Sequence, residues 1–475
     1  MKKQWKRLAA LSSAAVMAAG TLLYFPIDTL QNISWGITAS AEETGTETWN
    51  EDNLTWTLDA DGTLTISGSG AMKDYSHDSP AYSNSKIKKV VIENGVTSIG
   101  TSAFEHCSSL TNISIPKSVT SIGNYAFFEC TGLTSISISE GVTSIGVSAF
   151  ESCTGLTSIT IPKSVTSIGD NAFYGTLWLT NKRQENDSLV IVNGILIDGT
   201  TCSGEVTIPD GVTNIGNSAF FGCSGLTNIS IPKSVTSIRD FAFFGCTGLT
   251  SVTIPKSVTS VGDKAFSGCG KLTEVLLENG STLTSGNLGV NESQIGTYWN
   301  EGNLTWTLAA DGTLTISGTG AMKDYSSSDS PATQKKNNVK KVVIEDGVTS
   351  IGAYAFSGCN NLASIEIPSS VTSIGIGAFQ NCSSLTDITI LGSVTSIEDY
   401  AFFGCSSLTS ITIPESVTSI GESAFYNCTG LTSIEIPEGV TSIGGSAFER
   451  CSSLTSIKIP KSVTSIENSA FYNCT

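Results

Sequence analysis

The chain has 475 residues, of which only 14% are charged, and its formal net charge is −17 at pH 7. An acidic surface of this size repels phosphate backbones, so the composition argues against nucleic-acid binding. After the N-terminal apolar run, no stretch reaches the roughly 20 apolar residues that a membrane helix needs. We therefore expect no transmembrane segment once that run is removed.

The first 41 residues have the features of an export signal. Basic residues at Lys2–Arg7 precede an apolar run at Leu8–Phe25, and an Ala-Ser-Ala sequence at 39–41 offers a cleavage site. The sequence predicts a signal peptide over residues 1–41 and an extracellular protein, secreted or cell-wall associated. Because the gap between the run and the cleavage site is long, an uncleaved N-terminal anchor stays the alternative.

A segment of alternating apolar residues follows the signal and recurs 250 residues later, Trp49 to Tyr75 corresponding to Trp299 to Tyr325. Both copies contain Leu-Thr-Trp-Thr-Leu, an Ala-Asp-Gly-Thr turn and Leu-Thr-Ile-Ser-Gly. This pattern predicts short strands joined by a hairpin turn. We expect a small β cap over residues 42–89 and a second over 295–341, each covering the exposed edge of the first repeat behind it.

A 23-residue phrase occupies most of the remaining chain and occurs thirteen times. It reads Leu-x-x-Ile-x-Ile-Pro-x-x-Val-x-x-Ile-Gly-x-x-Ala-Phe-x-x-Cys, and one copy runs from Leu133 to Cys153. A fixed period in the twenties predicts a solenoid, in which one supersecondary unit stacks on copies of itself. A single copy buries too little apolar area to offset the entropy of ordering it, so the shared interfaces must stabilise the stack.

Within the repeat, Ile-x-Ile alternates with period two and predicts a short strand, which the following proline ends. Val-Thr-Ser-Ile predicts a second β-like step, and Ala-Phe-x-x-Cys is long enough for one helical or 3₁₀ turn. The predicted fold class is an α/β repeat solenoid, rich in β-strand with short helical or 3₁₀ turns, in two arrays that each follow a β cap. The arrays span residues 90–294 and 342–475, and the second stops within its last repeat.

Residues 182–205 interrupt the first array after its fourth repeat. Leu189–Val192 and Ile195–Ile197 flank Asn193-Gly194, a pair typical of tight hairpin turns. The segment therefore predicts a hairpin that projects from the stack. Cys202 lies in it, out of phase with the other cysteines, and is either a reactive thiol, a thiol that pairs between molecules, or a partly buried one.

The other twelve cysteines share one position of the repeat, so they form a column with neighbours about 4.8 Å apart. That spacing is within reach of a disulfide. However, each cysteine has two equivalent partners, and Thr176 takes the position in the fourth repeat. We expect buried, reduced thiols. No histidine recurs beside the column, so we do not expect it to bind metal.

The sequence offers no motif of established chemistry. The only two histidines, His77 and His106, have no paired nucleophile, and no phosphate loop, metalloprotease motif or nucleophile elbow occurs. We therefore expect neither an enzyme nor a bound cofactor or metal.

The repeat phrase resembles the BspA-like leucine-rich repeat family of bacterial surface proteins. The resemblance covers the chain from Val90 to its end, apart from the second cap. It implies a secreted or wall-associated protein, often proposed to be an adhesin, and it brings no catalytic residues. Related proteins frequently carry a C-terminal anchor or docking module, and none is visible in this sequence.

The residue after the repeat phenylalanine is the best candidate for ligand contact, because it is aromatic in seven of the thirteen repeats. Rings that point outward would form a row suited to stacking on sugars or packing on a partner. The alternative is that each ring tucks against the turn of the next repeat. The candidate ligand-binding residues are Phe128, Tyr174, Phe221, Phe244, Phe403, Tyr426 and Tyr472.

These observations predict a non-catalytic adhesion protein that presents its repeats to a polymeric extracellular ligand, either a polysaccharide or a host or matrix protein. Repetition suits this function because avidity multiplies weak contacts. The alternative is a rigid spacer or scaffold whose specificity lies in a C-terminal module outside this sequence.

Overall fold

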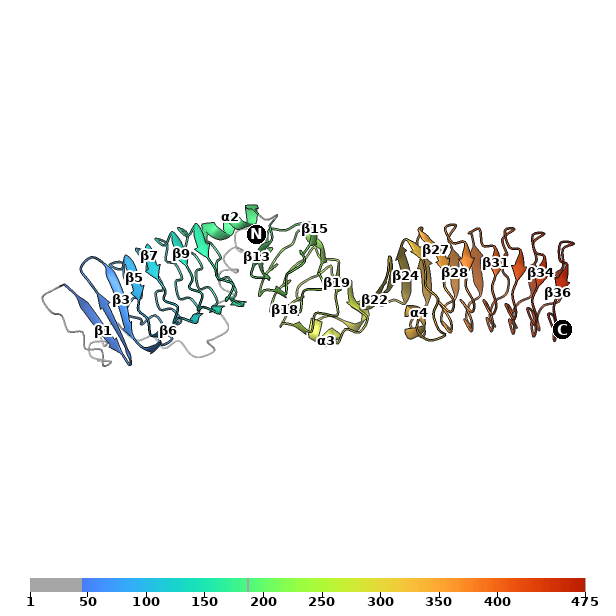
Figure 1. The fold of residues 1–475 in the computed structure, drawn as a ribbon, viewed down its shortest axis with the longest axis horizontal. Coiled ribbons are helices and arrows are strands. Elements are labelled where there is room, and N and C mark those ends of the chain that lie inside the picture. The colour runs from blue at the N-terminus through green and yellow to red at the C-terminus, as the bar shows by residue number, and fades with distance from the viewer. Residues whose placement is uncertain (1–44, 186–187, 475) are drawn as a thin grey trace, which may run out of the picture.

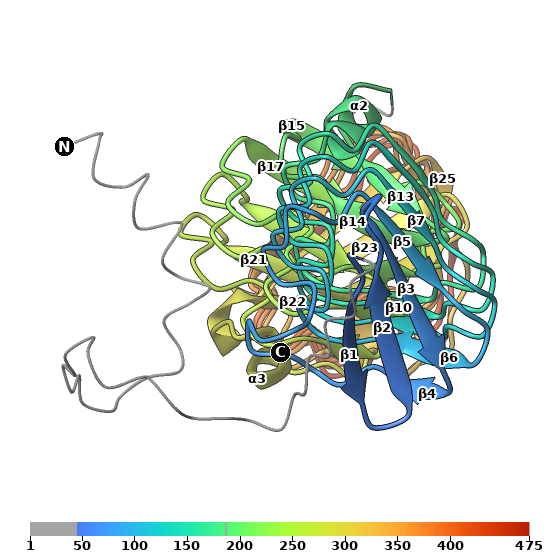
Figure 2. The same ribbon diagram turned by 90° about the vertical axis from the view of Figure 1, so that its left-hand side faces the viewer.

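The computed structural model describes residues 45–185 and 188–474, so the signal peptide predicted at residues 1–41 lies outside the described residues. The described chain is an elongated stack of rungs, a rung being one copy of the repeat (Figure 1). It begins at β1 (Glu47–Glu51) and ends at β36 (Ser465–Ile466). Seen from one end in Figure 2, the coils of successive rungs overlap around a common interior. The fold is the predicted leucine-rich solenoid.

The first ladder of strands comes from the Ile-x-Ile part of the repeat. In β30 (Asp387–Ile390) both isoleucines are buried, whereas Asp387 and Thr389 are exposed. Almost all of these strands pair in parallel and in register with the equivalent strand one rung away. The ladder consists of β5 (Lys89–Ile92), β7 (Asn112–Ser114), β9 (Ser135–Ser137), β11 (Ser158–Thr160), β15 (Gly204–Thr207), β17 (Leu226–Ser230), β19 (Ser251–Ile254), β21 (Glu274–Glu278), β26 (Lys341–Ile344), β28 (Ser364–Ile367), β30, β33 (Ser433–Glu435) and β35 (Ser456–Lys458).

The Val-Thr-Ser-Ile part forms a second parallel ladder. Its threonine hydroxyls run along the stack on the outside, and most of them donate to the threonine carbonyl one rung earlier, as Thr143 does to Thr120 at 3.1 Å. The ladder consists of β4 (Gly70–Ala71), β6 (Val96–Ile99), β8 (Ser121–Ile122), β10 (Ser144–Ile145), β12 (Ser167–Ile168), β14 (Ile195–Asp198), β16 (Asn214–Ile215), β18 (Ser237–Ile238), β20 (Ser260–Val261), β25 (Gly320–Ala321), β27 (Val348–Ile351), β29 (Ser373–Ile374), β31 (Ser396–Ile397), β32 (Ser419–Ile420), β34 (Ser442–Ile443) and β36.

The Ala-Phe-x-x-Cys segment is not the helical or 3₁₀ turn that the sequence predicts. In the described rungs it consists of turns, and the residues before its alanine and before its cysteine have positive φ, as Ser102 (φ 52°) and His106 (φ 61°) do in the first rung. Alternate amides then point along the stack: the Phe104 N–H donates to the Ala126 carbonyl at 2.8 Å. Left-handed residues interrupt the run of right-handed residues that a helix requires, so the segment forms a third hydrogen-bonded ladder instead.

The repeat phenylalanines form columns through the interior. Successive rings stack almost parallel, with centroids 5.0 Å apart for Phe220 and Phe243. Trp56 and Trp306, both 0% exposed, continue two of the columns by contacting the first phenylalanine behind them. The buried apolar residues fall into three clusters along the described chain, and these clusters are the cores that stabilise it.

The cysteine column lies beside the phenylalanines, and all thirteen cysteines are free thiols. Each thiol has a hydrogen-bonding function as well as an apolar one. The Sγ of Cys130 donates to the Phe104 carbonyl at 3.1 Å, and that of Cys428 donates to the Phe402 carbonyl at 3.2 Å. A buried carbonyl therefore gains a donor from the next rung.

The glycine before the Ala-Phe segment is explained by close approach of two backbones. A Cβ on Gly146 would lie 2.5 Å from the amide nitrogen of Asn124 in the preceding rung, and φ at Gly146 is not positive. Replacement of this glycine in three rungs agrees with the absence of a left-handed requirement, although it demands a local shift of the backbone.

The hairpin at 182–205 forms but does not project from the stack. β13 (Val190–Val192) pairs antiparallel with β14, and β14 in turn pairs in parallel with β16, so the segment is an atypical rung. Its second strand continues the short ladder, because Ile195 and Leu196 are buried in the core. The predicted projection is therefore wrong.

Cys202 is likewise in line with the cysteine column. Its side chain is buried, and its carbonyl accepts the Sγ of Cys223 at 2.9 Å. Burial raises the pKa of its thiol to about 11. Cys202 looked out of phase in the sequence because its spacing to Cys223 is shorter than one repeat. In this rung Gly199 takes the place of the repeat phenylalanine, and the ring of Phe220 occupies the space beside it.

Within residues 45–185 and 188–474, helices occur only where the repeat is interrupted. They are α2 (Leu177–Glu185), α3 (Ser285–Leu288), the 3₁₀ helix η2 (Glu292–Gln294) and α4 (Pro331–Gln334). In α2, the Trp178 ring contacts Phe173 at 4.8 Å, tilted by 60°, and ends the first phenylalanine column. No helix in the described residues is long and apolar enough to cross a membrane.

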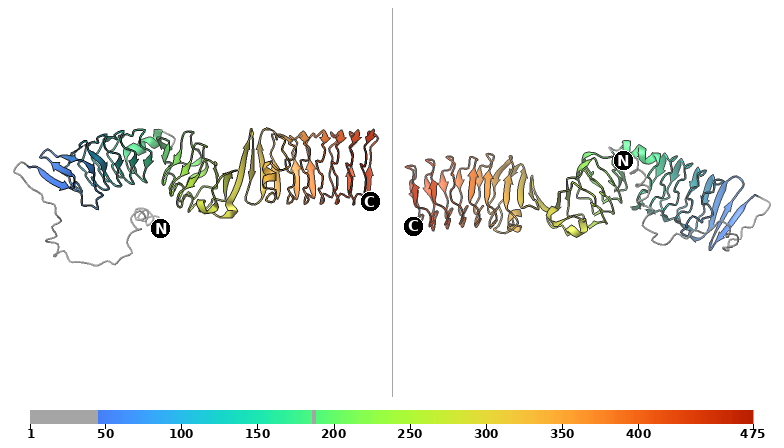
Figure 3. Two further views of the ribbon diagram at one scale, coloured as in Figure 1. Left: turned by 60° about the horizontal axis from the view of Figure 1, so that its bottom comes forward. Right: turned by 180° about the vertical axis from the view of Figure 1, so that it is seen from behind.

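The duplicated segment forms a three-stranded antiparallel unit in both places. The first copy contains β1, β2 (Leu54–Leu58) and β3 (Thr63–Gly68), and the second contains β22 (Ile295–Glu301), β23 (Leu304–Leu308) and β24 (Thr313–Gly318). The third strand of each pairs in parallel with the rung behind it. In the second copy, β22 also pairs in parallel with β21 of the rung in front. One eight-stranded sheet therefore runs from β15 to β26 across both arrays (Figure 3).

Candidate functional site

The seven candidate aromatic residues lie at the surface of the turn ladder. Tyr174, Phe221 and Tyr472 are 53%, 46% and 60% exposed, and the other four are partly buried. They sit one residue after the buried phenylalanine column, so the alternation of the turn ladder directs them outward. We call these seven residues the aromatic row.

Rings of the row stack on one another where neighbouring rungs both carry them. Phe221 and Phe244 are 5.1 Å apart, and Phe403 and Tyr426 are 4.8 Å apart and within 3° of parallel. The rung spacing imposes this distance. Part of each ring is thus covered by its neighbour, while its outer surface stays accessible.

A second aromatic position, missed in the sequence, lies three residues earlier in the rung. Tyr125, Phe241 and Tyr400 lie there and contact the row residue of the same rung, with Tyr400 and Phe403 6.0 Å apart. The i, i+3 recurrence was visible, but only the positive φ at this position brings both rings to one surface.

Charged groups flank the last stacked pair. The Arg450 guanidinium lies over the Tyr426 ring at 5.6 Å, and the Tyr400 hydroxyl donates to Glu422 at 3.3 Å. The Glu422 carboxylate raises the pKa of Tyr400. Arg450 also pairs with Glu449 at 3.9 Å, so this surface combines ring faces with a cation and two carboxylates.

The two histidines meet at the first rung. His77 and His106 both contact the carboxylate of Glu105, at 3.2 and 3.4 Å, and His106 also contacts Glu129 at 3.0 Å. The Glu105 side chain is only 7% exposed. In the second copy the corresponding residues are Ser327, Ser357 and Gly358, so the cluster belongs to the first rung alone.

Nothing in the described residues gathers three metal-ligating side chains in a metal-binding arrangement. The histidine cluster therefore has no support as a metal centre.

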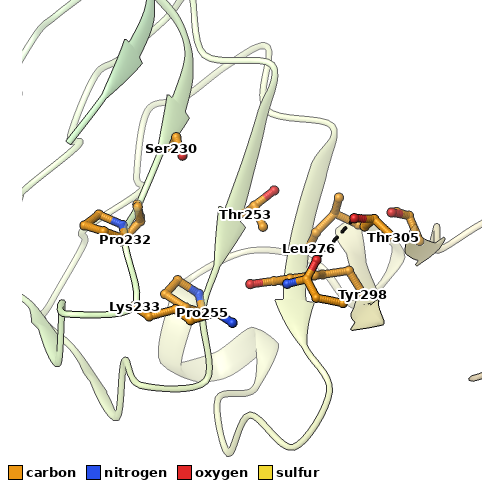
Figure 4. Close-up of a pocket in the computed structure, with 11 residues that line it drawn as sticks. Ser230, Pro232, Lys233, Thr253, Pro255, Leu276, Tyr298 and Thr305 are labelled. Atoms are coloured by element: carbon orange, nitrogen blue, oxygen red, sulfur yellow. Dashed lines mark hydrogen bonds between the residues drawn. The ribbon is translucent and has the colours of Figure 1, made fainter. Parts of the chain in front are cut away.

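A shallow groove of about 300 Å³ lies on the strand face, where array one meets the second duplicated unit. Strands β17, β19 and β21 contribute Ser230, Thr253 and Leu276, and the antiparallel pair β22–β23 contributes Tyr298 and Thr305 (Figure 4). Pro232, Lys233 and Pro255 border it from the turns that follow β17 and β19. We call it the junction groove.

The junction groove could not be predicted from the sequence, because the outward positions of the strands before it are Ser and Thr. Its defining ring, Tyr298, replaces Thr48 of the first copy, and pairing of β21 with β22 is needed to bring it beside Leu276. The register is set by contacts that are far apart in sequence.

The repeats identify the family. A family model described as the BspA type leucine rich repeat region matches residues 77–193, 199–294, 330–429 and 377–475, which is more than half of the chain. The chain belongs to this family. Its members are leucine-rich repeat proteins and are generally non-catalytic.

Solved structures of bacterial leucine-rich repeat proteins are also similar to the chain. One from Bacteroides ovatus is 29% identical, over 90% of this chain and 92% of that one, with a TM-score of 0.32. A leucine rich cell surface protein from Faecalibacterium prausnitzii is 31% identical, over 86% of this chain and 94% of that one, with a TM-score of 0.26. A comparison with curated proteins found no match.

Proposed function

We propose that this chain is a secreted or cell-wall-associated adhesion protein that binds a polymeric extracellular ligand, a polysaccharide or a host or matrix protein, through its aromatic row. Membership of a bacterial surface repeat family supports a binding role. The observation that carries the proposal is the accessible, stacked pair Phe403 and Tyr426, with Tyr400 beside it.

The arrangement suits many weak contacts better than one strong contact. A ring face at the surface offers a platform for a sugar ring or an apolar side chain, worth about 0.5–1.5 kcal/mol beyond the area that it buries. Platforms recur along the rod at Phe221–Phe244 and at Phe403–Tyr426. A polymer that spans both gains avidity without any site being strong.

The export signal completes the proposal. Residues 1–41 would direct the chain out of the cell, where its acidic surface keeps it soluble. The net charge of −17 argues against nucleic acid as the ligand.

The test is retention of the purified chain on insoluble polysaccharides, mucin and matrix proteins. It uses a row variant with four changes, Phe221→Ser, Phe244→Ser, Phe403→Ser and Tyr426→Ser. A control variant carries changes on the strand face instead, at Glu366→Ser, Glu435→Ser and Lys458→Ser. Circular dichroism checks that both variants keep the β-rich fold.

Retention of the parent and the control, with loss of the row variant, is the expected result. Retention of the row variant would exclude the row as the binding surface. If the parent is retained on nothing, adhesion by this part of the chain is wrong.

A rigid spacer is the second candidate, and one observation favours it. The eight-stranded sheet from β15 to β26 joins the two arrays by backbone hydrogen bonds rather than by a linker. Such a rod would hold a binding module at a fixed distance from the cell even if its own surface were inert.

A further inference from the structure

The junction groove exists only because the two arrays are joined. Its floor needs strands on both sides, the parallel strands β17, β19 and β21 and the antiparallel pair β22–β23. In the first copy, β1 is the edge of its sheet within the described residues, so no equivalent groove forms there. The groove lies on the strand face and does not include the aromatic row.

Two residues make this part of the strand face unlike the rest. The outward position at mid-strand is Ser or Thr in the six rungs before Leu276. Tyr298 stands where the first copy has Thr48, although the partner strand is the same: Tyr298 lies opposite Thr307 as Thr48 lies opposite Thr57. An apolar side chain and a ring have thus been added at one place on a hydroxyl-rich surface.

Tyr298 also has an unused polar group. Its side chain is 6% exposed, yet its hydroxyl makes no hydrogen bond to any described residue, and Figure 4 shows that hydroxyl directed toward the side of the groove formed by Pro255. Burial and the neighbouring Glu278 raise the pKa of Tyr298, so the phenol keeps its proton at neutral pH. The Tyr298 hydroxyl is therefore a donor at the groove that no protein group uses and that a ligand can engage.

The charge of the groove is positive on a protein that is negative. Lys256 is engaged by Glu278, whose carboxylate accepts the Lys256 amide at 3.0 Å and lies 3.9 Å from its ammonium. Lys233, one rung earlier, is exposed and has no ion pair within the described part of the chain. Its ammonium is the available charge at the groove.

We propose that the junction groove binds a pyranose ring that bears a carboxylate, a uronic acid unit of an acidic polysaccharide. The carboxylate pairs with Lys233, the Tyr298 hydroxyl donates to a ring oxygen or hydroxyl, and the ring's apolar face lies on Leu276. The hydroxyls of Ser230 and Thr253 and the amide of Asn300 can bond the remaining sugar hydroxyls. A groove of about 300 Å³ is at the lower end of the size of small-ligand sites, which suits one or two sugar units.

The test is calorimetry with the full chain and a panel of uronic acid trimers, each compared with its methyl ester, which keeps the ring and removes the charge. Lys233→Gln removes the cation, and Tyr298→Phe removes only the hydroxyl. Lys163→Gln is the matched control, because Lys163 has the same place in a rung far from the groove. The row variant is measured too.

At least one acid trimer should bind the parent, and its ester should bind about tenfold more weakly. Lys233→Gln should weaken binding of the acid trimer by about the same factor, and Tyr298→Phe should weaken it several-fold. Lys163→Gln and the row variant should bind the trimer as tightly as the parent does. Binding that is lost in the row variant, equal binding of acid and ester, or no binding of any trimer at millimolar concentration would overturn the proposal. The row variant changes the aromatic row and leaves the groove intact. The proposal for the groove and the proposal for the aromatic row can therefore be refuted independently of each other.

Discussion

Replacing one buried phenylalanine by alanine should open the stack locally, and Phe425→Ala is the cleanest case. Phe425 is 0% exposed and stacks on Phe402 at 5.3 Å and on Phe448 at 5.2 Å. Removing the ring deletes both contacts and leaves a cavity.

The loss of stability depends on how far the neighbouring rungs can move to fill the cavity, and they can move very little. The backbone ladder holds the spacing, with the Phe402 N–H donating to the Ala424 carbonyl at 2.8 Å and the Phe425 N–H to the Ala447 carbonyl at 2.7 Å. Phenylalanine to alanine in a core costs about 3–5 kcal/mol, and an uncollapsed cavity places this case near 4 kcal/mol. Tyr426→Ala, one residue later, removes a surface ring and should cost about 1 kcal/mol.

The assay is native-state hydrogen exchange, because a chain with three separate cores does not unfold in one step. Amides of the rungs around Phe425 should lose protection worth about 4 kcal/mol. Rungs near Phe127 should keep theirs, since each rung contacts only its neighbours. Equal effects of Phe425→Ala and Tyr426→Ala, or an equal loss of protection near Phe127, would refute the reasoning.

Two further predictions concern buried ionisable groups. Burial raises the pKa of Cys382, Cys405 and Cys428, so these thiols should resist alkylation in the native chain at pH 8. The two partly exposed thiols, Cys269 and Cys474, should react first, and mass spectrometry of the alkylated peptides checks the order. Burial, with repulsion from Asp240, raises the pKa of Asp170 from 3.8 to about 6, so its ionisation opposes folding increasingly as the pH rises from about 4 to 6. Asp170→Asn should therefore raise the melting temperature at pH 7.5, by an amount equivalent to about 1 kcal/mol after solvent screening, and leave it unchanged near pH 4; a gain at pH 4 as large as that at pH 7.5 would contradict this.

The repeating part of the fold could be predicted because each rung repeats the same local pattern. The alternation in Ile-x-Ile and the buried positions of Phe and Cys follow from the 23-residue period alone, and the β-strands of the first two ladders lie where that pattern places them. The outward aromatic row could be named from the same period, although its ligand could not.

The turn ladder was misread, because only its second left-handed position carries a residue signal, glycine in six rungs and asparagine in three, whereas its first position carries almost none. The first left-handed position carries residues such as Ser102, Tyr125 and Lys264, with glycine only at Gly377. A chain of L-residues accepts this conformation because each inter-rung hydrogen bond repeats along the stack, a tertiary effect that outweighs the local preference. Without it, a helical turn was the reasonable expectation for Ala-Phe-x-x-Cys.

The atypical rung was misread for a similar reason. Asn193-Gly194 correctly indicated a hairpin, but no local feature shows that β14 continues the ladder into β16. Cys202 is closer in sequence to Cys223 than one full repeat. Gly199 accommodates this difference, because it has no side chain and the Phe220 ring occupies the space that a side chain would take.

The junction between the arrays yields the last prediction. Gly296 in β22 lies opposite Leu276 of β21, and a Cβ there would meet the Leu276 Cδ2 at 2.6 Å and the Leu308 carbonyl oxygen at 2.7 Å. The first copy has Thr46 at this place, at the edge of its sheet. Leu276 is flexible, but the carbonyl belongs to β23 and cannot move without breaking the β22–β23 pairing.

Gly296→Thr should therefore separate β21 from β22 while both arrays keep their cores. Hydrogen exchange at the Asn279 amide, which donates to the Tyr298 carbonyl, should accelerate, and small-angle scattering should show a broader distribution of end-to-end distances. Gly286→Thr is the control, because a Cβ there meets nothing nearer than 3.7 Å. If Gly296→Thr leaves both measurements unchanged, the continuous sheet is not what makes the rod rigid, and the spacer function loses its support. If it also abolishes uronic acid binding, the junction groove requires the joined arrays, as its geometry implies.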